Sequence, residues 1–129
     1  MKEIWKDIKG YEGYYEISSI GRVKRLQTII DAPYMKDSGY RTIKEKILKP
    51  QNTGNYKSVA LSKEGIVKTI AVHRLVAIQY IPNSNNYPLV MHLDNNPSNN
   101  SIDNLQWGNN SMNIKQAVRD GRWNNQYTI

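Results

Sequence analysis

His92 and two asparagines that follow it, Asn104 and Asn113, have side chains and a spacing that suit the hydrolysis of a phosphodiester bond. A neutral imidazole, with an ordinary pKa of about 6.5, can take a proton from water at neutral pH. The amide oxygen of Asn113 is a ligand for a hard divalent cation, which neutralises charge on a scissile phosphate. The amide of Asn104 can accept a hydrogen bond from the second imidazole nitrogen and so fix the tautomer.

A structural interpretation of the same residues stays open on spacing alone. Asparagine is a common turn former, and asparagines with no assigned chemistry fill the same region at positions 95, 96, 99, 100, 109 and 110. The other histidine, His73, opens an apolar stretch in which a structural role is more common than catalysis. We therefore expect His73 to be mainly structural, whereas His92 is a candidate general base.

The elements around His92 must be short. Residues 89–93 predict a strand, and a polar loop separates them from a second ordered segment that contains Leu105 and Trp107. A helix is predicted to begin at 109–111 and to run to about 120, because apolar residues recur at 114, 117 and 118 and Gly121 can end it. Strand, loop, strand and helix in so short a span form a platform on which the three side chains can converge.

The residues upstream predict antiparallel hairpins. Residues 15–18 and 22–26 alternate around a turn, with Ile17 and Val23 facing inward. Residues 56–62 and 67–72 predict a second hairpin. Between the two hairpins, residues 31–46 are polar and contain a proline and a glycine, so an irregular or mobile connection is expected there. A helix over about 75–81 is expected to end at Pro82.

The composition limits the class of protein. The chain has 129 residues, 18 Lys+Arg against 11 Asp+Glu, and no cysteine. This length suits one domain or two small modules. The absence of cysteine excludes disulfides, thiolate zinc sites and cysteine nucleophiles, and it favours a cytosolic setting. No run approaches the roughly 18 apolar residues of a membrane span, and the charged first residues do not resemble a signal peptide.

The positive charge is concentrated in one region. Residues 22–74, hereafter the basic stretch, hold twelve Lys or Arg and four acidic residues, a net charge of +8, whereas both flanks are nearly neutral. This distribution favours one part that binds a polyanion and another with a different task. An ordinary solvated surface is the alternative.

A family resemblance lies in four short segments. Residues 72–77 (VHRLVA), 92–100 (HLDNNPSNN) and 104–107 (NLQW), together with Asn113, resemble the HNH endonucleases of phage and intron origin in their His-Asn-Asn variant. Residues 3–23 resemble NUMOD4, a DNA-contacting module that often precedes this nuclease domain. The two matches cover most of the chain in the order usual for the family.

The resemblance implies an α+β protein in which N-terminal antiparallel β-hairpins precede a ββα-metal nuclease module. The NUMOD4-like module is expected over residues 1–70, the HNH module over 71–123, and a C-terminal tail over 124–129. The implied activity is divalent-metal-dependent cutting of double-stranded DNA. His92 would be the general base, Asn104 would orient its imidazole, and Asn113 would bind one Mg²⁺ or Mn²⁺ ion.

Met91 departs from the family pattern. The residue before the catalytic histidine is usually Asp, Asn or His and serves as a metal ligand, but a thioether binds magnesium and manganese poorly. Asp94 is the nearest carboxylate and would substitute if the loop folded back. The alternative function is therefore a DNA-binding protein on an HNH scaffold whose turnover is impaired.

The predicted phosphate contacts lie mainly in the basic stretch and on the last helix. Tyr40 and Tyr56 lie among these residues. They are expected either to pack against the sugar or backbone of DNA or to be partly buried in the core. A monomer that nicks one strand is favoured, with a dimer possible, and the bacterial cytoplasm is expected for a protein encoded by a phage or mobile element. The predicted DNA-binding residues are Arg22, Lys24, Arg25, Lys36, Arg41, Lys44, Lys57, Arg74, Lys115, Arg119 and Arg122.

Overall fold

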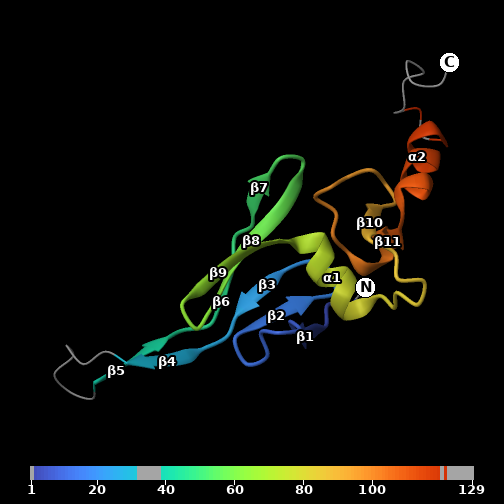
Figure 1. Ribbon diagram of the computed structural model, residues 1–129. Helices are drawn as coiled ribbons and strands as arrows, with labels where there is room; N and C mark the ends of the chain where they lie inside the picture. Colours follow the sequence, from blue (N-terminus) through green and yellow to red (C-terminus); the bar gives the residue numbers. More distant parts are fainter. Residues whose placement is uncertain (1, 32–38, 120, 122–129) are drawn as a thin grey trace.

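A computed structural model describes residues 2–31, 39–119 and 121 (Figure 1). The first part of the chain contains the strands β1 (Trp5–Asp7), β2 (Tyr15–Ser18), β3 (Val23–Arg25), β4 (Thr28–Asp31), β5 (Tyr40–Ile43), β6 (Lys46–Ile47), β7 (Gln51–Thr53), β8 (Tyr56–Lys63) and β9 (Ile66–Ala71). The second part contains the helix α1 (Val72–Tyr80), the strand β10 (Leu89–His92), the 3₁₀ turn η1 (Ile102–Asn104), the strand β11 (Leu105–Gly108) and the helix α2 (Asn110–Arg119).

The strands form four small antiparallel sheets. Their orders are β1-β2-β3-β6, β4-β5, β7-β8-β9 and β10-β11. The β4-β5 hairpin projects at one end of the molecule and α2 lies at the other, with α1 between the upstream sheets and the β10-β11 pair (Figure 1). This arrangement confirms the α+β class, and α1 contacts both halves of the chain.

One hydrophobic core joins the two halves. It contains Ile17 from β2, Leu61 from β8, Val76 from α1 and Leu105 from β11, all buried. The hydroxyl of Tyr80 adds a polar tie, because it donates a hydrogen bond to the Ile17 carbonyl oxygen at 2.6 Å. The boundary expected at residues 70 and 71 stays a prediction, but the core that holds the fold together crosses it.

The predicted hairpins are present, and α1 begins near the expected position. Ile17 and Val23 point into the core, as expected from their alternation. The prediction of an irregular connection over 31–46 was wrong for its second half, because β5 pairs with β4 and β6 pairs with β3. The β4-β5 hairpin is mostly exposed on both faces, so its sequence lacks the alternation by which a half-buried strand is recognised.

Short strands at two other places were also not expected. β1 and β7 are each three residues long, and most of their residues are exposed. Backbone pairing with β2 and β8, rather than burial, defines them. In the described part of the chain, neither α1 nor α2 has the length and apolar character that crossing a bilayer requires.

The core predicts a difference between two isoleucines on strands. Ile17→Ala removes a side chain that is 0% exposed and should lower the free energy of unfolding by about 2–5 kcal/mol. Ile66→Ala, at a position that is 63% exposed, should change it by less than about 0.5 kcal/mol. Urea unfolding followed by circular dichroism measures both values, and equal losses would contradict the assignment of the core.

Candidate active site

β10 and β11 place His92 at the end of a two-stranded sheet. Their antiparallel register sets His92 opposite Leu105, and α2 packs beside the pair. The buried side chain of Gln116 makes this contact, because its Nε2 donates hydrogen bonds to the His92 carbonyl oxygen (2.8 Å) and to the Asn95 Oδ1 (3.1 Å). α2 is therefore fixed to the strand end that carries the histidine.

The imidazole of His92 is held by Asn100. Nε2 lies 2.7 Å from the Oδ1 of Asn100, and because a carbonyl oxygen only accepts, Nε2 must carry the proton. This hydrogen bond leaves Nδ1 with its lone pair available for a proton. The prediction that Asn104 makes this contact does not match the structure, in which a residue four positions earlier makes it.

Asn104 instead holds the loop that follows His92. Its Oδ1 accepts from the backbone N–H of Asp94 (3.1 Å), and its Nδ2 donates to Asp94 Oδ1 (2.9 Å) and to the carbonyl oxygen of Asn99 (2.8 Å). These bonds occupy both Nδ2 protons, so the side chain supports the imidazole only through the loop. Asn104 is buried at the end of η1, just before β11, and this burial fits its structural task.

Asp94 is turned into the loop and does not line the pocket beside His92. Its Oδ1 accepts from the backbone N–H of Asn96 (2.8 Å) and from Asn104, and its Oδ2 accepts from Nδ2 of Asn99 (2.8 Å). These hydrogen bonds, that of Asn99 foremost, lower the pKa of Asp94. Its predicted role as a replacement ligand is not supported by this geometry, because both oxygens already serve to close the loop.

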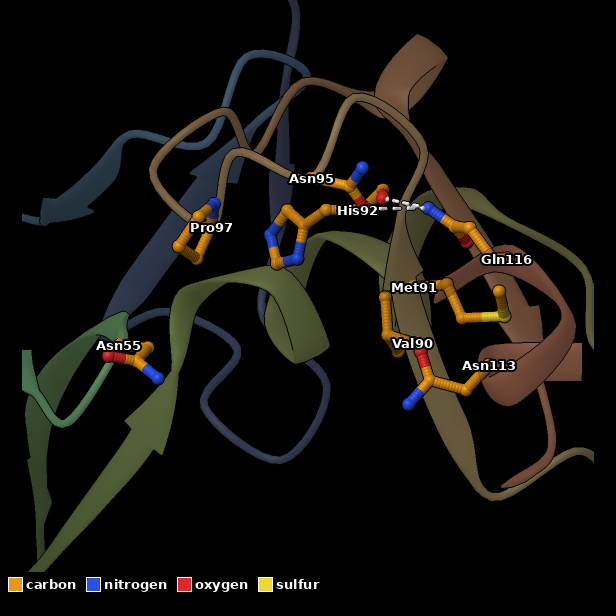
Figure 2. Close-up of a pocket in the computed structure, with 8 residues that line it drawn as sticks. All are labelled: Asn55, Val90, Met91, His92, Asn95, Pro97, Asn113 and Gln116. Atoms are coloured by element: carbon orange, nitrogen blue, oxygen red, sulfur yellow. Dashed lines mark hydrogen bonds between the residues drawn. The ribbon is translucent and has the colours of Figure 1, made fainter. Parts of the chain in front are cut away.

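An open pocket of about 430 Å³ lies beside His92 (Figure 2). His92 and Met91 from β10 and Asn113 and Gln116 from α2 line it, together with Asn55 from the turn between β7 and β8. Figure 2 shows Asn55 on the opposite side of the pocket from Asn113. The pocket is thus formed by both halves of the chain, and the predicted catalytic residues His92 and Asn113 both face it.

The donors around this pocket suit a hard divalent ion only in part. Asn113 offers an amide oxygen, but none of the described carboxylates lines the pocket. Among the described residues, no group of three or more His, Cys, Asp or Glu side chains could hold a metal. Magnesium keeps several waters and often binds with few protein ligands alongside substrate phosphates. The residues fit an ion held by Asn113, water and DNA phosphate.

Met91 belongs to the packing of this module. Met91 is 7% exposed and lies against Gly108 of β11. A Cβ added to Gly108 would collide with the Met91 sulfur and would lie 3.6 Å from Cε of Met112. A glycine at 108 therefore leaves room for the methionine. The thioether fills the space between β11 and α2, at the position where the resemblance implies a metal ligand.

His73 lies against the candidate base. Its ring packs edge-on between Tyr56 and His92, with centroid distances of 5.5 Å and 5.0 Å. Burial, with smaller effects of His92 and Arg74, lowers the pKa of His73 to about 4. Its buried Nδ1 has no hydrogen-bond partner among the described residues. His73 is therefore neutral at physiological pH, and it packs directly on His92.

Several predicted phosphate contacts are engaged within the protein. Arg22 forms an ion pair with Glu3 through two hydrogen bonds and lowers the pKa of that carboxyl to about 2. Lys24 lies over the ring of Trp5 at 4.2 Å. The first hairpin therefore offers less free positive charge than its sequence suggests.

Three further basic residues also have protein partners. Arg25 donates to the carbonyl oxygen of Lys44 (3.2 Å), Lys57 donates to Oδ1 of Asn52 (2.6 Å), and Arg74 donates to the carbonyl oxygen of Pro88 (3.0 Å). A partner of this kind orients a side chain without preventing a phosphate contact. Their role in DNA binding stays a prediction.

The remaining predicted contacts lie on the surface or outside the described residues. Arg41 on β5, Lys44, and Lys115 and Arg119 on α2 are exposed. Lys115 and Arg119 line a second pocket that shares Met91 and Gln116 with the first. Lys36 and Arg122 lie outside the described residues.

Sequence reasoning missed Asn100 and Gln116. Asn100 was one of several asparagines in a polar run, and nothing in its type distinguished it from its neighbours. Gln116 carried no signal either, because it lies on the side of the predicted helix opposite to the apolar positions 114, 117 and 118. In the structure Gln116 is buried, whereas Ile114 and Val118 are exposed. A buried amide commonly satisfies backbone groups of a neighbouring element.

The environment of His73 predicts a pH dependence of stability. Its pKa is lower in the folded state than the ordinary value of about 6.5, so the unfolded state binds more protons between pH 6.5 and 4. The free energy of unfolding should therefore fall as the pH drops through this range. His73→Phe keeps a ring in the stack and should flatten the dependence. Urea unfolding at several pH values measures it, and an unchanged slope in the variant would contradict the assignment.

Comparisons with known proteins agree with this geometry. The NUMOD4 motif matches residues 3–62, and the HNH endonuclease family matches residues 71–114. DNA endonuclease I-HmuI of Bacillus phage SP01 is 38% identical over 120 residues, which are 93% of this chain and 60% of that protein. The uncharacterized HNH endonuclease L245 of Acanthamoeba polyphaga mimivirus is 47% identical over 75 residues, 57% of this chain and 23% of that protein.

A solved structure gives the same result for the fold. It is described as DNA binding and cleavage by the HNH homing endonuclease I-HmuI, and it matches with a TM-score of 0.73 at 36% identity over 94% of this chain and 61% of that one. The chain thus spans about three fifths of this relative's length. On this evidence residues 71–114 match the HNH endonuclease family, and residues 3–62 match the NUMOD4 motif that precedes them.

Proposed function

We propose that this protein is a divalent-metal-dependent DNA endonuclease that uses His92 as its general base. The observation that carries the proposal is the hydrogen bond from His92 Nε2 to Asn100, at the wall of an open pocket that Asn113 shares. A base needs one nitrogen held and the other free, and this contact supplies that condition. The match to the HNH endonuclease family and the name of the phage relative, a DNA endonuclease, support the same reaction.

In this proposal the reaction is hydrolysis of one phosphodiester bond. His92 takes a proton from a water molecule through Nδ1, and the resulting hydroxide attacks phosphorus. One P–O bond forms and another breaks, a solvent water gives a proton to the leaving oxygen, and His92 afterwards returns its own proton to solvent. Asn100 holds the imidazole during both transfers, since the Nε2–H bond persists when the ring becomes positively charged.

A divalent ion, Mg²⁺ or Mn²⁺, would be held by Asn113 with water and DNA phosphate. When bound, it would supply the positive charge that stabilises the negative charge developing on the phosphate and the leaving oxygen. Asn113 would orient the scissile group relative to His92 from α2, which Gln116 fixes to β10. Asp94 would support the loop rather than the ion.

Double-stranded DNA would lie across the pocket, between the β7-β8 turn and α2. Asn55 and Asn113 line opposite sides of this pocket (Figure 2). Lys115 and Arg119 lie next to it on α2, and Arg41 is exposed on the β4-β5 hairpin. Contacts of this kind bind phosphate without reading the sequence.

Removing the base should separate cutting from binding. Wild-type protein is expected to convert supercoiled plasmid to the open-circle or linear form with Mg²⁺ or Mn²⁺, and EDTA should stop the reaction. His92→Ala should lower the rate by at least about 10²-fold, in line with the usual contribution of a general base, while the Kd for duplex DNA changes little. Gel analysis of the plasmid and fluorescence anisotropy of a labelled duplex measure the two effects.

A different outcome would favour the second candidate function. Two observations favour impaired turnover on a DNA-binding scaffold: Met91 is buried, and none of the carboxylates in the described part of the chain lines the pocket. If wild-type protein binds duplex DNA but cuts none with magnesium, manganese, cobalt or nickel, the endonuclease proposal is wrong. Binding by itself would then be the activity.

The salt dependence of binding tests the path of the DNA. If Lys115 contacts a phosphate, Lys115→Gln should reduce the slope of log Kd against log salt by about 0.9, because one counterion fewer is released. Lys115→Arg keeps the charge and should keep the slope. A slope that is the same in both variants would remove α2 from the DNA interface. Anisotropy titrations at four or five salt concentrations measure it.

A further inference from the structure

The turn between β2 and β3 lies directly against Asn100. Gly21, in this turn, approaches so closely that a Cβ at its position would lie 2.7 Å from Cβ of Asn100 and 3.1 Å from its carbonyl oxygen. A second contact lies two residues further along, where the backbone N–H of Ile102 donates to the carbonyl oxygen of Ser19 at 2.9 Å. The NUMOD4 motif therefore touches the segment that holds the imidazole.

This turn is rigid. The hydroxyl oxygen of Ser18 accepts from the backbone N–H of Arg22 (2.9 Å) and of Ile20 (3.3 Å). Two hydrogen bonds join Ser19 to Ile4. The hydroxyl oxygen of Ser19 accepts from the backbone N–H of Ile4, and the backbone N–H of Ser19 donates to the Ile4 carbonyl oxygen. Ser18 and Ser19 are both buried. A turn fixed in this way can define the position of whatever packs on it.

Asn100 needs such a support. Its side chain is 5% exposed and accepts the Nε2–H of His92, but the loop between them is held mainly by hydrogen bonds among its own polar residues. A shift of Asn100 by a few tenths of an ångström would lengthen or bend that hydrogen bond. Hydrogen bonds weaken steeply as their geometry departs from the optimum.

We propose that Asn100 is a positioning residue for His92, and that the Ser19–Gly21 turn of the NUMOD4 motif holds it in place. This inference rests on the function proposed above. The NUMOD4 motif then has two tasks, contact with DNA and completion of the nuclease site. Gly21 is required for a steric reason as well as for its φ of +92°, since a side chain there would displace Asn100.

Two glycine variants separate the steric effect from the backbone effect. Gly21 and Gly13 lie in the same motif with φ of +92° and +83°, but a Cβ on Gly13 meets nothing within 4 Å. Both alanine variants carry the strain of a positive φ, whereas only Gly21→Ala displaces Asn100. We expect Gly21→Ala to lower the single-turnover rate of plasmid cutting at saturating protein by about 10–100-fold more than Gly13→Ala, with similar Kd values for duplex DNA.

A second pair of variants tests Asn100 without relying on cutting. The chain has two histidines, so ¹⁵N NMR of the imidazoles reports the tautomer of His92 once His73→Phe has assigned the signals. Wild-type protein should show His92 protonated at Nε2 and not at Nδ1. Asn100→Leu, which is similar in size but cannot accept, should give a mixture of tautomers and a loss of rate. Asn100→Asp keeps an acceptor oxygen and should restore the Nε2–H tautomer.

Three results would overturn the inference. They are an equal loss of rate in Gly21→Ala and Gly13→Ala, an unchanged tautomer in Asn100→Leu, and a mixture of tautomers in the wild type. If Gly21→Ala does not fold while Gly13→Ala does, the close contact of the turn with Asn100 is needed for the fold itself, and the Asn100 pair then decides whether Asn100 orients His92. If wild-type protein binds DNA but does not cut it, the proposed function fails, while the NMR comparison still tests whether Asn100 orients His92.

Discussion

The orientation of one imidazole is the constraint on which the rest of this structure depends. A histidine can accept a proton from water only if one ring nitrogen is held and the other is left free. In this chain the Oδ1 of Asn100 holds Nε2 at 2.7 Å, and Gln116 holds the backbone of His92 from α2. Asn104 and Asp94 close the loop that connects these positions. Each of these four side chains thus either touches His92 or fixes a residue that does.

The same constraint explains why the two sequence motifs share one core. The segment from β10 to α2 has fewer than about 40 residues, a length that buries too little apolar surface to be stable by itself. Leu105 gains its burial from Ile17, Leu61 and Val76, which belong to the upstream strands and to α1. The nuclease elements therefore depend on the β-rich part of the chain for stability, and the contact of Gly21 with Asn100 lies at the edge of that shared core.

Fewer positively charged side chains are free to contact DNA in the folded protein than the sequence suggests. The net +8 of residues 22–74 is real, but Arg22 is paired with Glu3, and Lys24 lies over Trp5. These residues stabilise the first hairpin as well as adding to the field around the molecule. Long-range attraction of a polyanion depends on the summed charge, whereas a direct phosphate contact requires a side chain that is free to turn.

The sequence by itself determined the family, the hairpins around Ile17 and Val23, the positions of the two helices, and the choice of His92 and Asn113 as residues that face one pocket. Each of these is recorded in local periodicity or in a spaced motif. Only the tertiary structure decided that Asn100, rather than Asn104, holds the imidazole, and that Asp94 serves the loop. The physical reason is that several asparagines in one loop have the same hydrogen-bonding groups. Packing against Gly21, 79 positions away in the chain, selects which of them reaches His92.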